Sequence, residues 1–301
     1  ADNKPVRGIE KVFGQYLHPE TESYIDVFSD AMNRPLFSMG YQIKESDNQC
    51  YDVQLTLDYN IQQILEHVLD NYPSRKHGGI VVDAITGDIL ALASRPHYKQ
   101  HDPTSLITDG MNSSFLTIPF EQYPIGSVYK IIVSAAALES GKYNENSIFS
   151  CNGGIQVGSI WVPCNSAANS LETITLREAF AYSCNDTFIK IAQEIGGDAI
   201  INMSRKFGLG KSIEIELPNA TGRLMKKNEY TGAGIANLAI GQGSTMVTPL
   251  QVADIITTIL NGGIRKPLKL VNGLVDPEKN IIKNIEKQKL VQNNRIISQL
   301  T

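Results

Sequence analysis

A serine and a lysine share one short segment of the chain, "PIGSVYKIIVSAAALESG", in which Ser127 is followed three residues later by Lys130. The residues behind them are mostly apolar and run to Gly141, a pattern that predicts a buried helix with a glycine just past its C-terminus. Positions i and i+3 lie on the same face of a helix. We therefore expect the hydroxyl and the amine to lie one above the other.

Acyl transfer through a serine nucleophile is the chemistry that this pair could perform. A serine hydroxyl is a weak nucleophile unless a neighbouring base removes its proton. A lysine acts as that base only when its pKa falls, and burial among apolar side chains lowers the pKa because it disfavours the charged form. Free N–H groups at the start of a helix also favour a developing anion. The alternative is a buried helix that begins with a serine and whose lysine reaches out to solvent.

A second pair of polar residues, Ser183 and Asn185, lies in the string "YSCN" between two predicted helical segments. The first of these segments begins at Thr175 with Glu178 three residues later, the pattern of a capping box. In a cleft between two helices a hydroxyl can pass a proton to a leaving group, and an amide can hold a substrate carbonyl. The alternative is that both residues cap the second helix.

The elements that must position these residues follow an order of strands first and helices afterwards. Residues 1–50 predict extended, irregular structure with a strand pair in "DVFSDAMNRPLF". A strand is predicted over 52–57, followed by a helix that begins at the N-cap Asp58. The apolar face of this helix is expected to comprise Ile61, Ile64, Leu65, Val68 and Leu69.

A hairpin is predicted in "GGIVVDAITGDILALASRP", with its turn at residues 85–88 and with Pro96 ending the second strand. The rest of the chain is mainly helical, including a helix with Pro249 near its first turn. This order predicts an α+β, three-layer fold.

The composition limits the function further. The chain has 301 residues with a net charge of −4, which argues against a nucleic-acid partner. No apolar run is long enough to span a bilayer, and no signal peptide opens the sequence. None of the four cysteines lies in a Cys-x-x-Cys pair, so we expect no cofactor and no metal. Cys151 and Cys164 bracket a predicted hairpin. The sequence is compatible with a disulfide between them and equally with two buried thiols.

Ser-x-x-Lys and Ser-x-Asn together resemble the signature of the penicillin-recognising serine acyltransferases. Nearly the whole chain resembles the transpeptidase domain of class B, monofunctional penicillin-binding proteins, through segments that occur in the expected order: "GIEKVFGQYL", "LTLDYNIQQILEHVL", "GGIVVDAITGDILALASRPHY", "YPIGSVYK", "AYSCNDTFIKIAQEIG" and "NLAIGQGSTMVTPLQVA". The resemblance implies the penicillin-binding-protein transpeptidase fold, which is serine β-lactamase-like. It also implies that residues 1–50 are the remnant of an N-terminal pedestal and that residues 51–301 are the transpeptidase domain.

The resemblance implies a role for each candidate residue. Ser127 would be the acylated nucleophile and Lys130 its base, with Ser183 and Asn185 as the second-motif pair. The backbone N–H of Ser127 would supply half of the oxyanion hole. The implied activity is peptidoglycan D,D-transpeptidation, which cross-links stem peptides and is inhibited by β-lactams. The resemblance also implies that the protein acts on the extracytoplasmic face of the bacterial membrane, with its membrane anchor absent from this chain. It further implies a cell-wall glycosyltransferase as partner.

The third motif of the family, Lys-Thr-Gly or Lys-Ser-Gly, does not occur between Ala1 and Thr301. We expect it, with the last strands of the sheet, to follow Thr301, because a single hairpin is only a marginal sheet. The chain as given, which lacks this motif, is expected to show little or no acylation by penicillin. Two alternatives to the transpeptidase are a non-catalytic or β-lactam-sensing scaffold and a serine β-lactamase. A class A β-lactamase would show Glu-x-x-Leu-Asn, which is absent, and a class D enzyme would show Ser-x-Val where this chain has Ser183-Cys184-Asn185.

Overall fold

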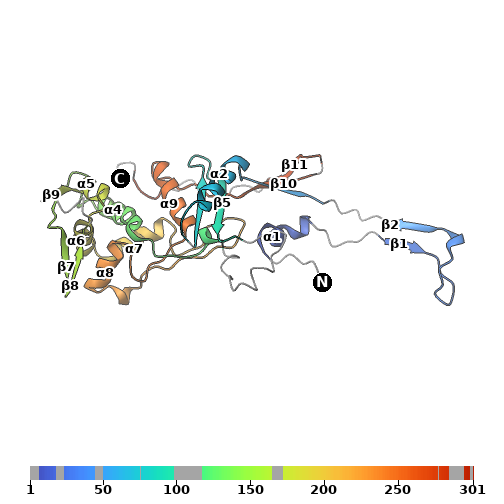
Figure 1. The fold of residues 1–301 in the computed structure, drawn as a ribbon, viewed down its shortest axis with the longest axis horizontal. Coiled ribbons are helices and arrows are strands. Elements are labelled where there is room, and N and C mark those ends of the chain that lie inside the picture. The colour runs from blue at the N-terminus through green and yellow to red at the C-terminus, as the bar shows by residue number, and fades with distance from the viewer. Residues whose placement is uncertain are drawn as a thin grey trace. The chain divides into compact units, whose positions relative to one another are not determined.

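The computed structural model describes residues 7–17, 24–44, 50–74, 76–97, 117–164, 172–276, 278–284, 295–298 and 301. The chain divides into two compact units, coloured by residue number in Figure 1. Unit 1 comprises Ala1–Thr56 and Leu270–Lys287, and unit 2 comprises Leu57–Lys269 and Gln288–Thr301. Among the described residues, no helix is both long enough and apolar enough to cross a membrane.

The described residues of unit 1 form one helix and two small antiparallel sheets. Its elements are α1 (Gly8–Leu17), β1 (Tyr24–Val27), the 3-10 turn η1 (Phe37–Met39), β2 (Tyr41–Lys44), β3 (Asp52–Leu55), β10 (Val271–Val275) and β11 (Ile281–Asn284). β1 pairs with β2, and β10 lies between β11 and β3. The strand pair predicted in "DVFSDAMNRPLF" forms only in part, since that segment holds the end of β1 and an isolated bridge between Ser29 and Pro35, whereas β2 follows it. The helix α1, which packs Phe13 against Val271 and Leu274, was not predicted.

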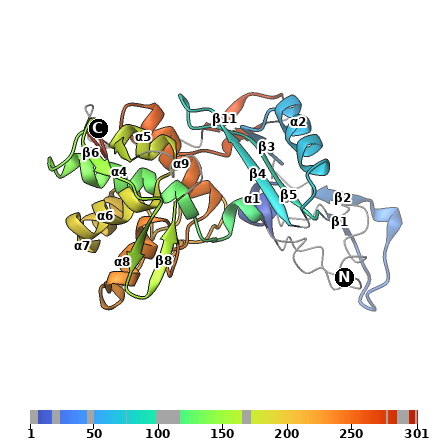
Figure 2. The ribbon, with the colours of Figure 1, turned by 60° about the vertical axis from the view of Figure 1, so that its left-hand side comes forward.

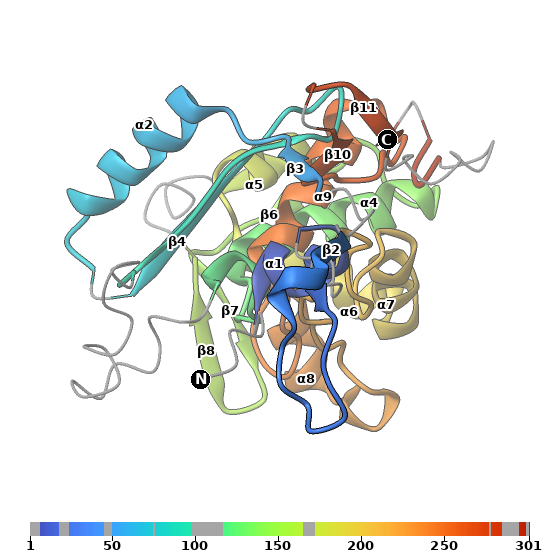
Figure 3. The same ribbon diagram turned by 90° about the vertical axis from the view of Figure 1, so that its right-hand side faces the viewer.

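Unit 2 contains the predicted β-hairpin. It consists of β4 (His77–Val82) and β5 (Ile89–Arg95). The helix α2 (Tyr59–Asp70) precedes it and begins as predicted, because the Asp58 carboxylate accepts hydrogen bonds from the backbone N–H groups of Asn60 and Ile61. Figures 2 and 3 both show α2 running alongside the hairpin.

The hairpin is covered on both faces. Side chains alternate between the faces of a strand, and a Cβ at Gly79 would meet Leu65 of α2, whereas a Cβ at Gly78 would meet Ile118. Ile118 belongs to the 3-10 turn η3 (Ile118–Phe120), which also contacts the helix α9 (Pro249–Leu260). Helix, hairpin and helix therefore form layers, in agreement with the mixed α/β fold predicted from the sequence.

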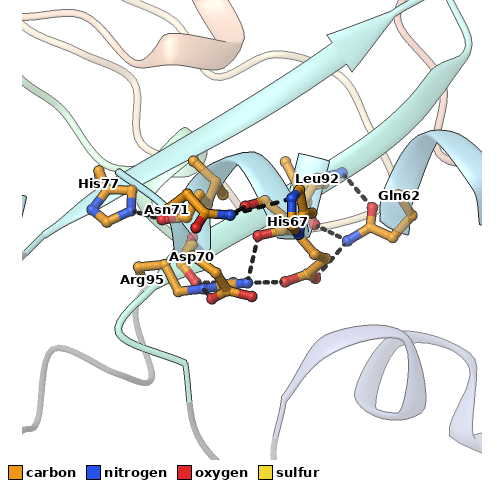
Figure 4. Close-up of polar contacts among 10 residues, drawn as sticks. Gln62, His67, Asp70, Asn71, His77, Leu92 and Arg95 are labelled. Carbon is orange, nitrogen blue, oxygen red and sulfur yellow. Dashed lines mark hydrogen bonds and ion pairs between the residues drawn. The ribbon is translucent and has the colours of Figure 1, made fainter. Parts of the chain in front are cut away.

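Only part of the predicted apolar face of α2 is buried. Leu69 is buried, but Ile64 is 64% exposed and Val68 is 55% exposed. The buried face of α2 differs from the predicted one, because Gln62 of α2 points toward β5 and binds its edge (Figure 4). The Gln62 amide donates to the carbonyl of Leu92 and accepts from its N–H, at 3.0 and 2.8 Å. A side chain thus takes the place of a neighbouring strand.

The C-terminal end of β5 is held to α2 by an arginine (Figure 4). Arg95 is 8% exposed, and its Nε donates to the Asp70 carboxylate at 2.6 Å. Its terminal nitrogen lies 2.5 Å from the Glu66 carboxylate and donates to the Glu66 carbonyl at 3.1 Å. Hydrogen bonding to Arg95 lowers the pKa of the Asp70 carboxyl. These contacts connect helix and hairpin into one body.

The remainder of unit 2 is mainly helical, with two short strand pairs. The further elements are the 3-10 turns η4 (Gly126–Tyr129) and η5 (Lys227–Glu229), the helices α4 (Lys130–Glu139), α5 (Leu176–Ala181), α6 (Asn185–Ile195), α7 (Gly197–Lys206) and α8 (Gly232–Ala239), and the strands β6 (Ile148–Ser150), β7 (Gly154–Val157), β8 (Ile160–Pro163) and β9 (Thr173–Thr175). The predicted capping box of Thr175 and Glu178 opens α5. The core lies where α4 packs against α6 and α7, around Tyr129 and Phe188.

Candidate active site

Ser127 lies in the turn η4, and Lys130 is the first residue of α4. The sequence predicted one helix over both residues, but its first turn is a 3-10 turn. This difference favours the pairing, because residues i and i+3 eclipse one another in a 3-10 helix. The Ser127 side chain is exposed, and the Lys130 ammonium donates to its hydroxyl across 3.4 Å. The nucleophile candidate therefore faces solvent with the amine beneath it.

Lys130 is only 1% exposed. Burial lowers the pKa of its amine from 10.5 to about 8, and the nearby Cys184 and Cys164 oppose the shift in part. The amine also lies 5.6 Å from the centroid of the Phe188 ring, on a fully buried side chain. A substantial fraction of the amine is therefore neutral near pH 8, and only the neutral amine can accept a proton.

Three oxygens of the second motif surround the same amine. Lys130 Nζ donates to the Ser183 carbonyl at 2.7 Å, to the Ser183 hydroxyl at 2.9 Å and to Asn185 Oδ1 at 2.7 Å. The structure thus brings together all four residues predicted from the sequence. Their side chains converge on one nitrogen, and the N-cap residue of α6, Cys184, makes no side-chain capping bond.

The turn between α5 and α6 orients Ser183 and Asn185. Ser183 adopts a positive φ of 55° while its N–H donates to Phe180 O at 3.1 Å. Asn185 Nδ2 donates to the carbonyl of Pro163 at 2.8 Å, so the amide is fixed at both ends and its oxygen faces Lys130. Amide and hydroxyl are therefore held in place before any substrate arrives.

Two positioning contacts of η4 were not predicted from the sequence. The Tyr129 hydroxyl lies 2.6 Å from the hydroxyl of Ser204, which donates to a backbone carbonyl of α7. Gly126 N–H donates to the carbonyl of Gly241 at 2.9 Å. A Cβ at Gly241 would lie 1.9 Å from Gly126 O, so only glycine permits this approach. The sequence signal that could have revealed this contact is the pair of glycines in Gly241-Gln242-Gly243.

The arrangement can move a proton between two hydroxyls. A charged ammonium has three N–H donors and no acceptor, whereas a neutral amine has two donors and one lone pair. With two donors used on the carbonyl of Ser183 and on Asn185 Oδ1, the lone pair is left for the hydroxyl of Ser127 or Ser183. Such an amine can take a proton from one hydroxyl and return it through the other.

The cysteine alternatives are also decided geometrically. Cys151 and Cys164 flank the predicted hairpin of β7 and β8, and both are buried thiols with sulfurs 3.7 Å apart. Cys184 joins them from the start of α6. The structure therefore shows buried thiols and no disulfide at this position.

Comparisons with known proteins show the family to which the chain belongs. Residues 78–301 match the family model described as the penicillin binding protein transpeptidase domain. The chain is 31% identical over 232 residues to penicillin-binding protein PbpB of Mycolicibacterium smegmatis, covering 75% of this chain and 35% of that protein. It is 28% identical over 312 residues to stage V sporulation protein D of Bacillus subtilis, covering 100% of this chain and 46% of that protein. The chain thus spans about a third to a half of these curated relatives' length.

A solved structure shows the same fold. Penicillin-binding protein A from M. tuberculosis, as a penicillin G acyl-enzyme complex, superimposes with a TM-score of 0.74 at 29% identity. The superposition covers 87% of this chain and 62% of that chain. The mixed α/β architecture predicted from the sequence is therefore that of a penicillin-binding protein transpeptidase domain.

Proposed function

The chain belongs to the penicillin-binding protein transpeptidase family, and from this premise we propose that it acts as a peptidoglycan D,D-transpeptidase through a serine acyl-enzyme. The observation that carries the proposal is the convergence on the Lys130 amine of the Ser127 hydroxyl and the second-motif oxygens. A surface serine with a buried base beneath it is an activated nucleophile. The peptidoglycan D,D-transpeptidase FtsI of Escherichia coli is among the relatives, at 26% identity over 92% of this chain.

In the first half-reaction, neutral Lys130 takes the proton of the Ser127 hydroxyl as Ser127 Oγ bonds to the carbonyl carbon of the terminal D-alanyl peptide bond. The C–N bond then breaks, and the departing amine receives a proton from the Ser183 hydroxyl, which regains one from Lys130. The backbone N–H of Ser127 is the donor that we assign to the developing oxyanion.

In the second half-reaction, an amine of a neighbouring stem peptide attacks the acyl ester. It loses a proton to the same relay, the ester C–O bond breaks, and Ser127 recovers its hydrogen. Asn185 Nδ2 uses one hydrogen on Pro163 O. We assign its second hydrogen to a carbonyl of the bound peptide.

β-Lactams enter the same first half-reaction. Opening of the lactam ring leaves the departing amine tethered to the acyl group, so the acceptor amine is kept out and the ester persists. The penicillin G acyl-enzyme of the M. tuberculosis relative is an intermediate of this kind. Persistence of the ester would separate a transpeptidase from a serine β-lactamase, which hydrolyses it, and from a non-catalytic scaffold, which never forms it. A β-lactam-sensing scaffold would also keep the ester, and only turnover of a D-alanyl peptide would separate a transpeptidase from it.

The organisation and location of the protein are part of the same proposal. We infer that residues 51–301 are the transpeptidase domain and that residues 1–50 belong to the pedestal that precedes it. Unit 1 also takes in residues 51–56 and 270–287, so the boundary after residue 50 stays a prediction. Peptidoglycan substrates place the activity on the extracytoplasmic face of the bacterial membrane. A glycosyltransferase partner is proposed because cross-linking needs newly polymerised glycan strands.

The test is covalent labelling with a tagged penicillin. In protein that includes a Lys-Thr-Gly or Lys-Ser-Gly motif, we expect one label per molecule, on Ser127 by peptide mass spectrometry, and none in Ser127→Ala. Ser140→Ala is the matched control, because Ser140 is an exposed hydroxyl at the other end of α4 and its loss should leave labelling unchanged. Label on any other residue, or rapid release of the penicilloyl group, would defeat the proposal.

A further inference from the structure

Three cysteine side chains form one buried cluster behind the second motif. The sulfur of Cys184 lies 3.4 Å from that of Cys151 and 3.6 Å from that of Cys164, and the remaining pair is 3.7 Å apart. Their side chains are 0%, 3% and 8% exposed, respectively. They come from three places in the chain: the segment before β7, the end of β8 and the N-cap of α6.

These separations suit a metal ion bound by thiolates. Zn²⁺ binds cysteine sulfur at about 2.3 Å in tetrahedral geometry, which requires sulfur–sulfur separations of about 3.8 Å. The triangle of sulfurs is slightly smaller than this, so an ion at bonding distance from all three would lie just outside their plane. No fourth histidine, cysteine or carboxylate joins the group in the part of the chain that the structure describes. Three thiolates would therefore leave one coordination position for an exogenous ligand.

Two of the three sulfurs accept hydrogen bonds from residues at the start of α6, although burial raises the pKa of the Cys151 and Cys164 thiols. The N–H of Asp186 donates to the Cys164 sulfur at 3.3 Å, and the Thr187 hydroxyl donates to the Cys184 sulfur at 3.4 Å. Donors of this kind orient metal ligands and stabilise their negative charge. Both sulfurs also lie at the N-terminus of α6, whose partial positive charge favours an anion.

We propose that Cys151, Cys164 and Cys184 form a binding site for one thiophilic metal ion of the Zn²⁺ class. Each thiol releases its proton to solvent as its sulfur bonds to the ion, so no electron transfer is involved. Because Cys184 links Ser183 to Asn185, the bound ion connects the second motif to the hairpin of β7 and β8.

The experiment uses the whole chain, fully reduced and free of oxygen, titrated with Cd²⁺ as a spectroscopic substitute for Zn²⁺. We expect a thiolate-to-cadmium absorption band in the ultraviolet that saturates at about one ion per chain and is displaced by Zn²⁺. Cys184→Ser should weaken binding at least about tenfold, since even loss of a supporting residue costs that much. Cys50→Ser is the matched control, because Cys50 is an exposed thiol outside the cluster, and it should bind normally.

Cadmium NMR of the unaltered chain keeps the test independent of whether the variants fold. A chemical shift typical of three sulfur ligands is expected. A shift typical of oxygen or nitrogen ligands, the absence of a saturable band, or loss of the band in Cys50→Ser would overturn the inference. Neither readout involves acylation, so the metal site and the proposed transpeptidase activity can fail separately.

Discussion

At the scale of single residues, the site depends on the amine of Lys130. Within the part of the chain that the structure describes, it is the group that contacts Ser127, Ser183 and Asn185 together. Its pKa of about 8 is a consequence of burial, and burial in turn results from the position of Lys130 at the start of the core helix α4. The packing that buries the Lys130 side chain is therefore also what makes its amine a base.

Replacing Lys130 by arginine separates charge from basicity. Arginine keeps the positive charge but stays protonated at any accessible pH. Lys130→Arg should therefore lose penicillin acylation by about 10²–10⁴-fold, the usual contribution of a general base. The second-order rate constant of penicillin acylation measures this loss. Lys142→Arg is the control, because the Lys142 side chain is exposed. A near-native rate in Lys130→Arg would reduce Lys130 to an electrostatic role.

The pH profile of acylation follows from the same pKa. Because the neutral amine is the reactive form, the rate should rise about tenfold per pH unit below the pKa and level off above about pH 8. The free energy of unfolding should also rise between about pH 8 and 10.5, where the unfolded chain still holds a proton that the folded chain has lost. A flat rate profile across this pKa would contradict the assignment of the base.

At the scale of elements, the edge of the β4–β5 hairpin is closed by a helix. Gln62 of α2 forms two hydrogen bonds with the backbone of Leu92 on β5, as a paired strand would. An open edge exposes unpaired backbone groups and invites association with other chains. We infer that this side chain holds α2 in register with the hairpin.

Gln62→Ala should lower the free energy of unfolding by about 1–3 kcal/mol, because it leaves two backbone groups of Leu92 without their partner. The neighbouring Gln63 is the control, since it bonds only to the exposed side of α2, at Tyr59. Gln63→Ala should change stability by less than about 0.5 kcal/mol. Denaturant unfolding of both variants measures the two changes in the free energy of unfolding. Equal changes would mean that the contact between Gln62 and Leu92 contributes nothing to stability.

At the scale of the whole chain, distant segments assemble the site. The Ser183 carbonyl and Asn185 lie 53 and 55 residues beyond Lys130, and Gly241 contacts Gly126 from the far end of α8. The Gly241 contact determines where the turn η4 begins. A change at Gly241 should thus alter Ser127 without touching it.

Gly241→Ala would bring a Cβ to 1.9 Å from Gly126 O. We expect a loss of more than about 2 kcal/mol of stability and a clear fall in penicillin acylation, because the chain before Ser127 must move. Gly243→Ala is the matched control, since Gly243 also has a positive φ but its Cβ would meet nothing closer than 3.4 Å. It should cost only the backbone strain of about 1–2 kcal/mol and keep acylation. Thermal unfolding and labelling rates distinguish the two.

Local signals in the sequence were sufficient for individual elements. The Asp58 N-cap, the Thr175 capping box and the β4–β5 turn all formed as predicted, because caps and turns are decided within a few neighbouring residues. The pairing of Ser127 with Lys130 could also be predicted, because these residues are only three positions apart in the chain. The helix α1 was missed, since its buried residue Phe13 packs on Val271 and Leu274 from the far end of the chain.

The site itself depended on contacts that no local pattern contains. Only the tertiary structure places Ser183 and Asn185 on the amine of Lys130, buries that amine so that its pKa falls to about 8, and adds Cys184 to the thiols of Cys151 and Cys164. The sequence determined which reactive groups the chain carries and which elements hold them. Distances and burial belong to the packed core, because each depends on segments that meet only when the chain has folded.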